Sequence, residues 1–339
     1  MILNGQLPQS IDAAAQALQC GDLVGLPTET VYGLAADAGN DVAITKIFKA
    51  KGRPANHPLI VHVASAQGAQ RFASQVPDFA QKLMDAFWPG PLTLILPRRP
   101  DVAAIAAGGQ NSVGVRCPSH VAALAVLQRA EALGVFGVAA PSANLFGRVS
   151  PTTAEHVAAE FGDDLLIIDG GACEVGIEST IVDCTRAAPV LLRPGVLTPQ
   201  ALSAVCGITV LTSNHTDADA PRASGTLESH YAPRAKVQVM TASELQQALD
   251  AQVKSIDLGV HAGAIAVWSR HPVRVPTAYI DYVKLQRMPQ GASDCAHQLF
   301  AQLREFDAQG VAQIWVETPP ETPDWDGIRD RLKRASTPA

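Results

Sequence analysis

Short polar clusters follow the apolar segments of this chain, at the positions where open α/β sheets usually bind their ligands. The segment Pro27–Gly33 (PTETVYG) offers two hydroxyls and a carboxylate on a turn framed by Pro and Gly. In the densest positive patch, Lys51 and Arg53 leave a predicted helix beside a strand, where they could clamp a phosphate or a carboxylate. The alternatives are an ordinary turn and a solvated helix face.

A second group of clusters combines hydroxyls with arginines. The segment Ser112–Arg116 (SVGVR) alternates as a strand, so Ser112 and Arg116 share one side and Gly114 leaves room between them. An Arg in an apolar strand needs an anion, which a structural ion pair and a bound ligand would supply equally well. Further polar groups follow apolar strands at Ser142, Asn144, Ser150, Glu178, Ser179, Thr180 and Arg193.

One histidine, His62, lies inside the apolar segment Leu59–Val63. By itself it is more typical of a structural residue than of a ligand. Cations, hydroxyls and one His that converge on a crevice would nevertheless suit a substrate with phosphates and a carboxylate, which points to a nucleotide together with an amino acid. The chain has no P-loop, no dinucleotide-binding glycine motif, no zinc-protease motif and no G-x-S-x-G elbow.

The composition is that of a globular protein with a large core. Of 339 residues, 47% are hydrophobic and 17% are charged, which excludes disorder as the main state. The formal net charge is −6, opposite in sign to that of a duplex-binding protein, so any nucleic-acid contact must be local. Six cysteines without a C-x-x-C pair favour free thiols over a disulfide framework or a zinc site. No leader peptide or membrane span is visible, so the cytoplasm is the expected location.

Alternating helical and apolar patterns predict an α/β fold in two domains. The first domain, 1–207, is predicted to hold a twisted mixed sheet with strands at 23–27, 59–63, 92–96, 112–116, 134–139, 165–168, 180–183 and 190–192. Its predicted helices are 11–19, capped by Ser10, and 41–50, 78–87, 120–132 and 153–161. The polar segment 208–235 is predicted to be a linker. A smaller α/β domain, 236–339, is predicted from strands at 237–240, 264–268 and 314–316 and helices at 243–251, 292–306 and 325–335.

Taken in order, these motifs resemble the threonylcarbamoyl-AMP synthase family. The matching segments are PTETVYG at 27–33, KGRP at 51–54, PLIVH at 58–62, SVGVR at 112–116, PSAN at 141–144, EST at 178–180, LRPG at 192–195 and HYAP at 230–233. The resemblance covers residues from about 10 to 235, and the C-terminal part is similar to the two-domain form of the family. It implies a YrdC-like catalytic domain with a twisted, mixed, open sheet, a linker that acts as a lid, and a smaller Rossmann-like α/β domain.

The resemblance also implies a reaction and the residues that perform it. L-Threonine, bicarbonate and ATP would give L-threonylcarbamoyl-AMP, pyrophosphate and water, with Mg²⁺ accompanying ATP. A tRNA threonylcarbamoyl transferase would use the product to modify tRNA, and RNA binding by this chain itself would be weak at most. The implied catalytic residues are Lys51 and Arg53, and no residue is assigned to a metal. The implied threonine-binding residues are Thr30, His62, Arg116, Ala140 and Ser179. The implied nucleotide-binding residues are Arg53, His57, Ser112, Ser142, Asn144, Ser150, Arg193 and, from the linker, Tyr231, with the backbone at Ala140 facing the nucleotide as well.

Two segments depart from the family pattern. His57 stands where the family usually has Asn, although an imidazole can still donate a hydrogen bond. The linker contains ASGTL at 223–227, where the family commonly has Pro-Gly-Met.

Two other functions remain as alternatives. An RNA-binding module could use the concave, locally positive surface of a YrdC-like domain. An enzyme making a different carbamoyl adenylate, as in hydrogenase maturation, would use carbamoyl phosphate, and the zinc-finger and acylphosphatase-like segments expected of it are not found in this sequence.

Overall fold

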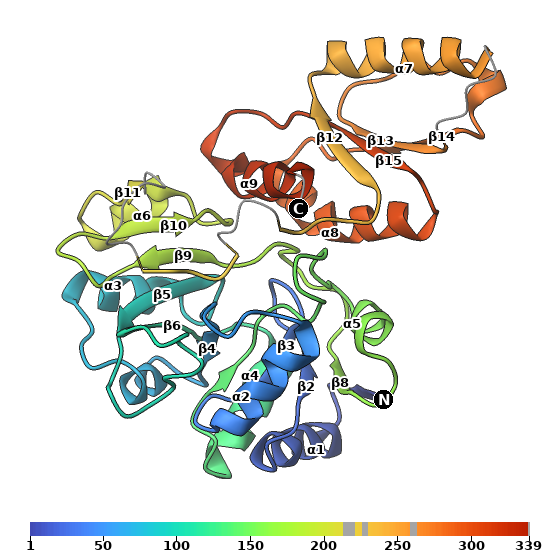
Figure 1. The fold of residues 1–339 in the computed structure, drawn as a ribbon. Coiled ribbons are helices and arrows are strands. Elements are labelled where there is room, and N and C mark those ends of the chain that lie inside the picture. Colours follow the sequence, from blue (N-terminus) through green and yellow to red (C-terminus); the bar gives the residue numbers. More distant parts are fainter. Residues whose placement is uncertain (213–220, 226–229, 258–262, 338–339) are drawn as a thin grey trace. The chain divides into compact units, whose positions relative to one another are not determined.

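The computed structural model describes residues 1–212, 221–225, 230–257 and 263–337 (Figure 1). The chain divides into two compact units, and each is described here by itself. The first comprises Met1–Phe146 and Ser150–Thr226, and the second comprises Gly147–Val149 and Leu227–Ala339. The predicted linker, 208–235, is therefore shared between the units, and its residues 213–220 and 226–229 lie outside the described part.

The first unit is built around one mixed sheet. Its described strands are β1 (Ile2–Asn4), β2 (Val24–Leu26), β3 (Gly33–Asp37), β4 (Ile60–His62), β5 (Leu92–Pro97), β6 (Ser112–Arg116), β7 (Val138–Ala139), β8 (Leu166–Asp169), β9 (Thr180–Asp183), β10 (Val190–Arg193) and β11 (Leu211–Thr212). They run side by side in the order β1-β8-β2-β3-β7-β4-β6-β5-β9-β10-β11. The sheet contains both antiparallel neighbours, such as β5 and β6, and parallel ones, such as β4 and β6. The predicted mixed, open sheet is confirmed.

Helices pack on both faces of this sheet. They are α1 (Pro8–Gln19), α2 (Asp41–Lys51), α3 (Asp78–Phe87), α4 (Val121–Ala132), α5 (Ala154–Phe161), α6 (Pro199–Cys206) and the short helix η1 (Gln67–Arg71). Within β3, Leu34 and Ala36 belong to the apolar cluster that includes α2 and α3, whereas Ala35 belongs to the cluster of α1 and α4. Because successive strand residues point to opposite faces, the two clusters lie on opposite sides of the sheet.

The first unit differs from the sequence prediction in several details, and β1, α6 and β11 are among the elements that were not predicted. The first helix begins at Pro8 with Leu7 as its cap, and Ser10 is buried inside the first turn; Pro is favoured there because the first N–H of a helix has no partner to lose. Strand β3 was not predicted, because it lacks β-branched residues. The strand predicted at 134–139 pairs only at Val138–Ala139.

The second unit is a four-stranded parallel sheet covered by helices. Its described strands, β12 (Lys236–Met240), β13 (Ile265–Ser269), β14 (Val283–Arg287) and β15 (Gln313–Glu317), run in the order β12-β15-β13-β14. In Figure 1, α7 (Ala242–Asp257) lies on one side of this sheet, and α8 (Ala292–Ala308) and α9 (Asp326–Ser336) lie on the other. Short helices η2 (Thr277–Tyr279) and η3 (Pro323–Trp325) complete the unit. The predicted Rossmann-like α/β arrangement is confirmed.

The cysteines are free, as the sequence predicted. Five of the six are buried, and Cys20 is exposed. None of the helices among the described residues is long and apolar enough to cross a membrane.

Candidate active site

Arg116 is the centre of a buried polar cluster where the parallel strands β4 and β6 end. Its guanidinium donates from Nη1 to Oγ1 of Thr30 at 2.8 Å and from Nε to the carbonyl oxygen of Gly90 at 3.2 Å. Its Nη2 forms an ion pair with Oε1 of Glu29 at 2.6 Å, and each of the two side chains is only 4% exposed. The anion that the sequence demands for Arg116 is therefore present as a protein carboxylate, and Thr30 lies beside it.

His62 is paired with Arg116 across the two strands. Its side chain is buried, and its Nδ1 has no hydrogen-bond partner in the described part of the chain. Burial, and then the nearby charge of Arg116, lowers the pKa of His62 to about 3. The imidazole is thus neutral at physiological pH, and Nδ1 is available to a ligand.

We expect His62 to make the protein less stable in mild acid. Its native pKa of about 3 lies below its ordinary value of 6.5, so the unfolded chain takes up a proton that the native state does not. Stability is therefore lost as the pH falls below about 6.5, by about 2 kcal/mol at pH 5. Urea unfolding of the wild type and of His62→Gln at pH 8 and pH 5 measures this. Equal losses in the two proteins would refute it.

A second guanidinium, that of Arg193, fixes the segment that enters β9. Arg193 donates to the carbonyl oxygen of Ser179 from Nε at 3.1 Å and from Nη2 at 2.9 Å, and also from Nη2 to the Ser179 hydroxyl at 3.1 Å. The Ser179 hydroxyl in turn lies 2.8 Å from Oγ1 of Thr93. Two residues predicted for different substrates, Ser179 for threonine and Arg193 for the nucleotide, are thus in direct contact.

Part of the predicted linker packs onto these arginines. The hydroxyl of Ser224 accepts a hydrogen bond from Nη2 of Arg53 at 3.2 Å, and its carbonyl oxygen accepts one from Nη1 of Arg193 at 2.9 Å. A small cavity lined by Ser224, Ser112 and Gly114 among others has room for about one water molecule. In this arrangement the linker contacts the guanidinium groups that the sequence predicts for the nucleotide.

Lys51 fastens the loop that carries Ser142 and Asn144. Its ammonium donates to the carbonyl oxygen of Ser142 at 2.6 Å and to that of Asn144. Its own carbonyl oxygen accepts a hydrogen bond from the backbone N–H of Phe146 at 2.8 Å. Burial, and then the charge of Arg53, holds the pKa of Lys51 well below its usual range. The predicted cation clamp therefore contacts protein carbonyls at the end of α2.

Phe146 connects this loop to the other predicted nucleotide residues. The guanidinium carbon of Arg53 lies 5.7 Å from the centre of the Phe146 ring, within reach of a cation–π contact. The imidazole of His57 lies edge-on to the same ring, with the ring centres 5.5 Å apart. Burial lowers the pKa of His57, and the charges of Arg53 and Arg222 lower it further, so this imidazole is neutral as well.

Ser150 and Ala140 complete the predicted set within the first unit. The buried hydroxyl of Ser150 donates to Oε1 of Glu178 at 2.5 Å. The backbone N–H of Ala140 donates to the carbonyl oxygen of Ile60 at 3.1 Å, which ties the strand end before Ser142 to β4.

Tyr231 belongs to the second unit. It is 1% exposed, has a φ of 63° and packs its ring against Phe300 of α8 at a centre-to-centre distance of 5.4 Å. The guanidinium carbon of Arg331 lies 5.5 Å from the same ring. The contact between Tyr231 and the nucleotide that the resemblance implies stays a prediction.

Several residues that the sequence did not assign to the site contact the predicted ones, among them Glu29, Thr93, Phe146, Glu178 and Ser224. A signal was present for Glu29, because an acidic residue inside an apolar turn needs a partner as much as a buried Arg does. Nothing in the sequence distinguished Phe146 or Ser224 from other loop residues.

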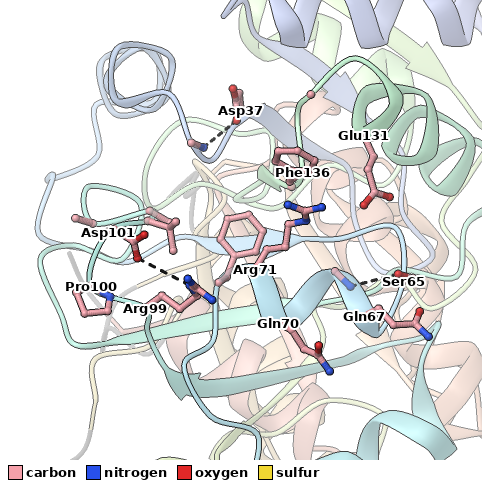
Figure 2. A pocket seen from close by; sticks show the side chains of 18 of the residues that line it. Asp37, Ser65, Gln67, Gln70, Arg71, Arg99, Pro100, Asp101, Glu131 and Phe136 are labelled. Atoms are coloured by element: carbon pink, nitrogen blue, oxygen red, sulfur yellow. Dashed lines mark hydrogen bonds and ion pairs between the residues drawn. The ribbon is translucent and has the colours of Figure 1, made fainter.

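A separate open cavity of about 900 Å³ in the same unit contains none of the predicted site residues (Figure 2). The guanidinium of Arg71 lies over the ring of Phe136, 3.8 Å from its centre, and Arg99 pairs with Asp101 at 3.9 Å. Of the charged side chains that line it, Arg99 thus contacts Asp101, and Arg71 contacts an aromatic ring. We therefore place the candidate active site at the arginine clusters.

Comparison with known proteins identifies the family. Residues 16–195 match the Sua5/YciO/YrdC family described as telomere recombination, and residues 197–337 match the threonylcarbamoyl-AMP synthase C-terminal domain. The threonylcarbamoyl-AMP synthase of Pyrococcus abyssi is 38% identical over 96% of this chain and 94% of its own length. That of Bacillus subtilis is 37% identical over 97% of this chain and 93% of its own. The crystal structure of P. abyssi Sua5 complexed with L-threonine superposes with a TM-score of 0.87 at 35% identity, covering 99% of this chain and 97% of the other. The chain therefore belongs to the threonylcarbamoyl-AMP synthase family, in its two-domain form.

Proposed function

We infer that this protein is an L-threonylcarbamoyladenylate synthase, a nucleotidyltransferase that converts L-threonine, bicarbonate and ATP into L-threonylcarbamoyl-AMP, pyrophosphate and water. The observation that carries this inference is the pair of buried guanidinium clusters, one around Arg116 and one around Arg53 and Arg193, in a chain that matches synthases over nearly its whole length. The carboxylate of threonine and the phosphates of ATP each need a cluster of this kind.

The Arg116 cluster fits an amino acid. Arg116 would bind the threonine carboxylate, since a guanidinium matches that group with paired N–H donors. His62 and Thr30 line the same cluster, and Ser179 and the backbone at Ala140 would complete the contacts. Because His62 is neutral, its free Nδ1 can bind a hydroxyl or an amine without adding a charge.

The Arg53 and Arg193 cluster fits the phosphates of ATP. Ser112, Ser142, Asn144, Ser150, His57 and Tyr231 would supply the remaining polar contacts of the nucleotide. Mg²⁺ enters with ATP as its counter-ion, and such ions are usually held by phosphates, water and one or two carboxylates. Among the described residues no group of three or more acidic, His or Cys side chains forms a metal site. Glu178, which accepts from Ser150, is the carboxylate that would complete the shell of a phosphate-bound Mg²⁺.

The reaction proceeds in two steps. In both, the protein positions the substrates and forms no covalent bond with them. The neutral amine of threonine attacks the carbon of bicarbonate, and a hydroxyl leaves with a proton as water, which gives the carbamate. An oxygen of the carbamate then attacks the α-phosphorus of ATP, the bond to the β-phosphate oxygen breaks, and pyrophosphate leaves. Arg53 and Arg193 would offset the charge that develops on the phosphates. Lys51 would act through the Ser142–Asn144 loop, because its ammonium contacts those carbonyls.

The linker is proposed to act as a lid. Ser224 contacts both Arg53 and Arg193, so these contacts must loosen when phosphates bind and can re-form around the product. A closed lid would keep water away from the labile mixed anhydride.

The chemistry of the product indicates which kind of reaction must follow this one. A reactive adenylate must be consumed by a second enzyme, which we propose is a tRNA threonylcarbamoyl transferase in the cytoplasm. The net charge of −6 makes strong RNA binding by this chain itself unfavourable.

Pyrophosphate release tests the proposal. Full-length protein is supplied with Mg²⁺ and ATP, and threonine and bicarbonate are each added or withheld. We expect release only when both are present. Release that needs neither, or salt-sensitive RNA binding without any turnover, would replace the synthase by another ATPase or by the RNA-binding alternative.

A further inference from the structure

Glu29 forms a buried ion pair with Arg116 but takes no part in the reaction proposed above. Glu29 is held in place from two sides besides the pair. Its Oε2 accepts a hydrogen bond from the backbone N–H of Ser119 at 3.2 Å, and its carbonyl oxygen accepts one from the N–H of Val175 at 2.7 Å. The carboxylate is therefore a fixed part of the Arg116 cluster.

Glu29 limits what Arg116 can offer to a ligand. A guanidinium has five N–H groups. In the described part of the chain, the carbonyl oxygen of Gly90 accepts from Nε and Oγ1 of Thr30 accepts from Nη1, whereas Nη2 faces Oε1 of Glu29 in an ion pair without the geometry of a hydrogen bond. One N–H on Nη1 and the part of Nη2 that does not face Glu29 remain, which is enough for a single carboxylate.

Glu29 also sets the charge of the cluster. Three titratable side chains near the ion pair are neutral at physiological pH, because burial lowers the pKa of His62 to about 3 and raises the pKa of Cys117 to about 11 and of Cys173 to about 12. The pair itself sums to zero. A ligand that carries only a carboxylate would bring one uncompensated negative charge next to a buried carboxylate, and such a charge is costly away from water. A ligand that also carries an ammonium group brings none.

We propose that Glu29 is a specificity-determining residue that makes the Arg116 subsite selective for zwitterions, that is, for free α-amino acids over carboxylic acids that lack the ammonium group. This inference rests on the proposed binding of threonine at Arg116. It assigns Glu29 a function in substrate choice in addition to its support of the Arg116 side chain.

Calorimetric binding to the full-length protein tests this. The probes are L-threonine and the matching 2,3-dihydroxybutanoate, in which a hydroxyl replaces the ammonium group. We expect wild type to bind threonine at least about 100-fold more tightly, a difference of about 2.7 kcal/mol. In Glu29→Gln, which keeps the shape and a hydrogen-bonding oxygen but loses the charge, the preference should fall to about tenfold or less because the hydroxy acid gains affinity.

Two variants separate an effect of Glu29 on ligand selectivity from its structural support of the Arg116 side chain. Glu29→Asp keeps the charge and should keep the preference for threonine even if both ligands bind more weakly. Asp183→Asn removes another buried carboxylate, one paired with Arg186 at 2.9 Å, and should leave the preference unchanged.

The outcomes are distinct. A Glu29→Gln protein that loses affinity for both probes in the same proportion would show a purely supporting role and overturn the inference. If Glu29→Gln does not fold, the wild type still decides, because hydroxy-acid binding within tenfold of threonine would overturn it too. Wild type that binds no threonine at all would reject the threonine subsite of the proposed function, and this inference with it.

Discussion

Replacing Arg116 by Met should abolish threonine-dependent turnover and also destabilise the protein. The substitution removes the donor for the substrate carboxylate, so kcat/KM for threonine should fall by about a thousandfold, which corresponds to about 4 kcal/mol. It also leaves Glu29 as a buried carboxylate without its partner. Loss of one member of a buried ion pair typically costs about 3–5 kcal/mol of stability.

A double variant separates these two effects of Arg116→Met. Adding Glu29→Gln removes the unpaired charge, so urea unfolding should show most of the stability restored, whereas threonine turnover should stay lost. If the single variant kept wild-type kinetics for threonine, Arg116 would be a structural ion-pair partner only. Recovery of turnover in the double variant would lead to the same conclusion.

Lys51→Met is expected to produce the second large effect, mainly on ATP. Met has nearly the length of Lys but cannot donate to the carbonyl oxygens of Ser142 and Asn144. Each buried carbonyl left without a donor costs about 1–3 kcal/mol, partly offset because a buried charge is removed as well. The loop that positions Ser142 and Asn144 should therefore shift, and kcat/KM for ATP should fall by about a hundredfold or more, with a clear rise in KM.

Lys46 on the same helix provides the matched control. Its ammonium pairs with Asp22 at 2.9 Å, and both side chains are largely exposed, so Lys46→Met should change stability by less than about 1 kcal/mol. Its steady-state kinetics should equal those of wild type. A Lys51→Met enzyme with unchanged KM for ATP and a reduced kcat would instead mean that Lys51 contacts the reacting phosphates directly.

The sequence predicted helices and strands correctly where their apolar pattern fits only one kind of secondary structure. Helix α3 and strand β6 were predicted with the bounds that the structure shows, since a strong apolar period or β-branched alternation allows no other element. Strand β3 (GLAAD) was missed because it has no β-branched residue and consists largely of Gly and Ala. A Cβ at Gly33 would lie 2.9 Å from Cβ of Ala140, so close packing selects small residues there against β propensity. Strand β14 lies at the edge of its sheet and is mostly exposed after Val283, which leaves no apolar pattern to detect.

The sequence predicted which polar residue types follow the apolar strands, but not their contacts. Burial of an Arg in the strand at 112–116 required an anion, yet nothing in the sequence could pair it with Glu29, because the two positions meet only when β6 is placed beside the turn after β2. The same holds for Lys51, whose charge suggested a phosphate and whose partners are carbonyl oxygens brought by a distant loop. Pairings of this kind depend on tertiary structure.

The identity of the product decides whether this protein is a threonylcarbamoyl-AMP synthase. Full-length protein is incubated with ATP, Mg²⁺, L-threonine and ¹³C-labelled bicarbonate, and the adenylate is analysed by mass spectrometry after rapid quenching. We expect a threonylcarbamoyl adenylate that carries the labelled carbon. A threonyl adenylate without that carbon, formed equally well when bicarbonate is withheld, would contradict this expectation.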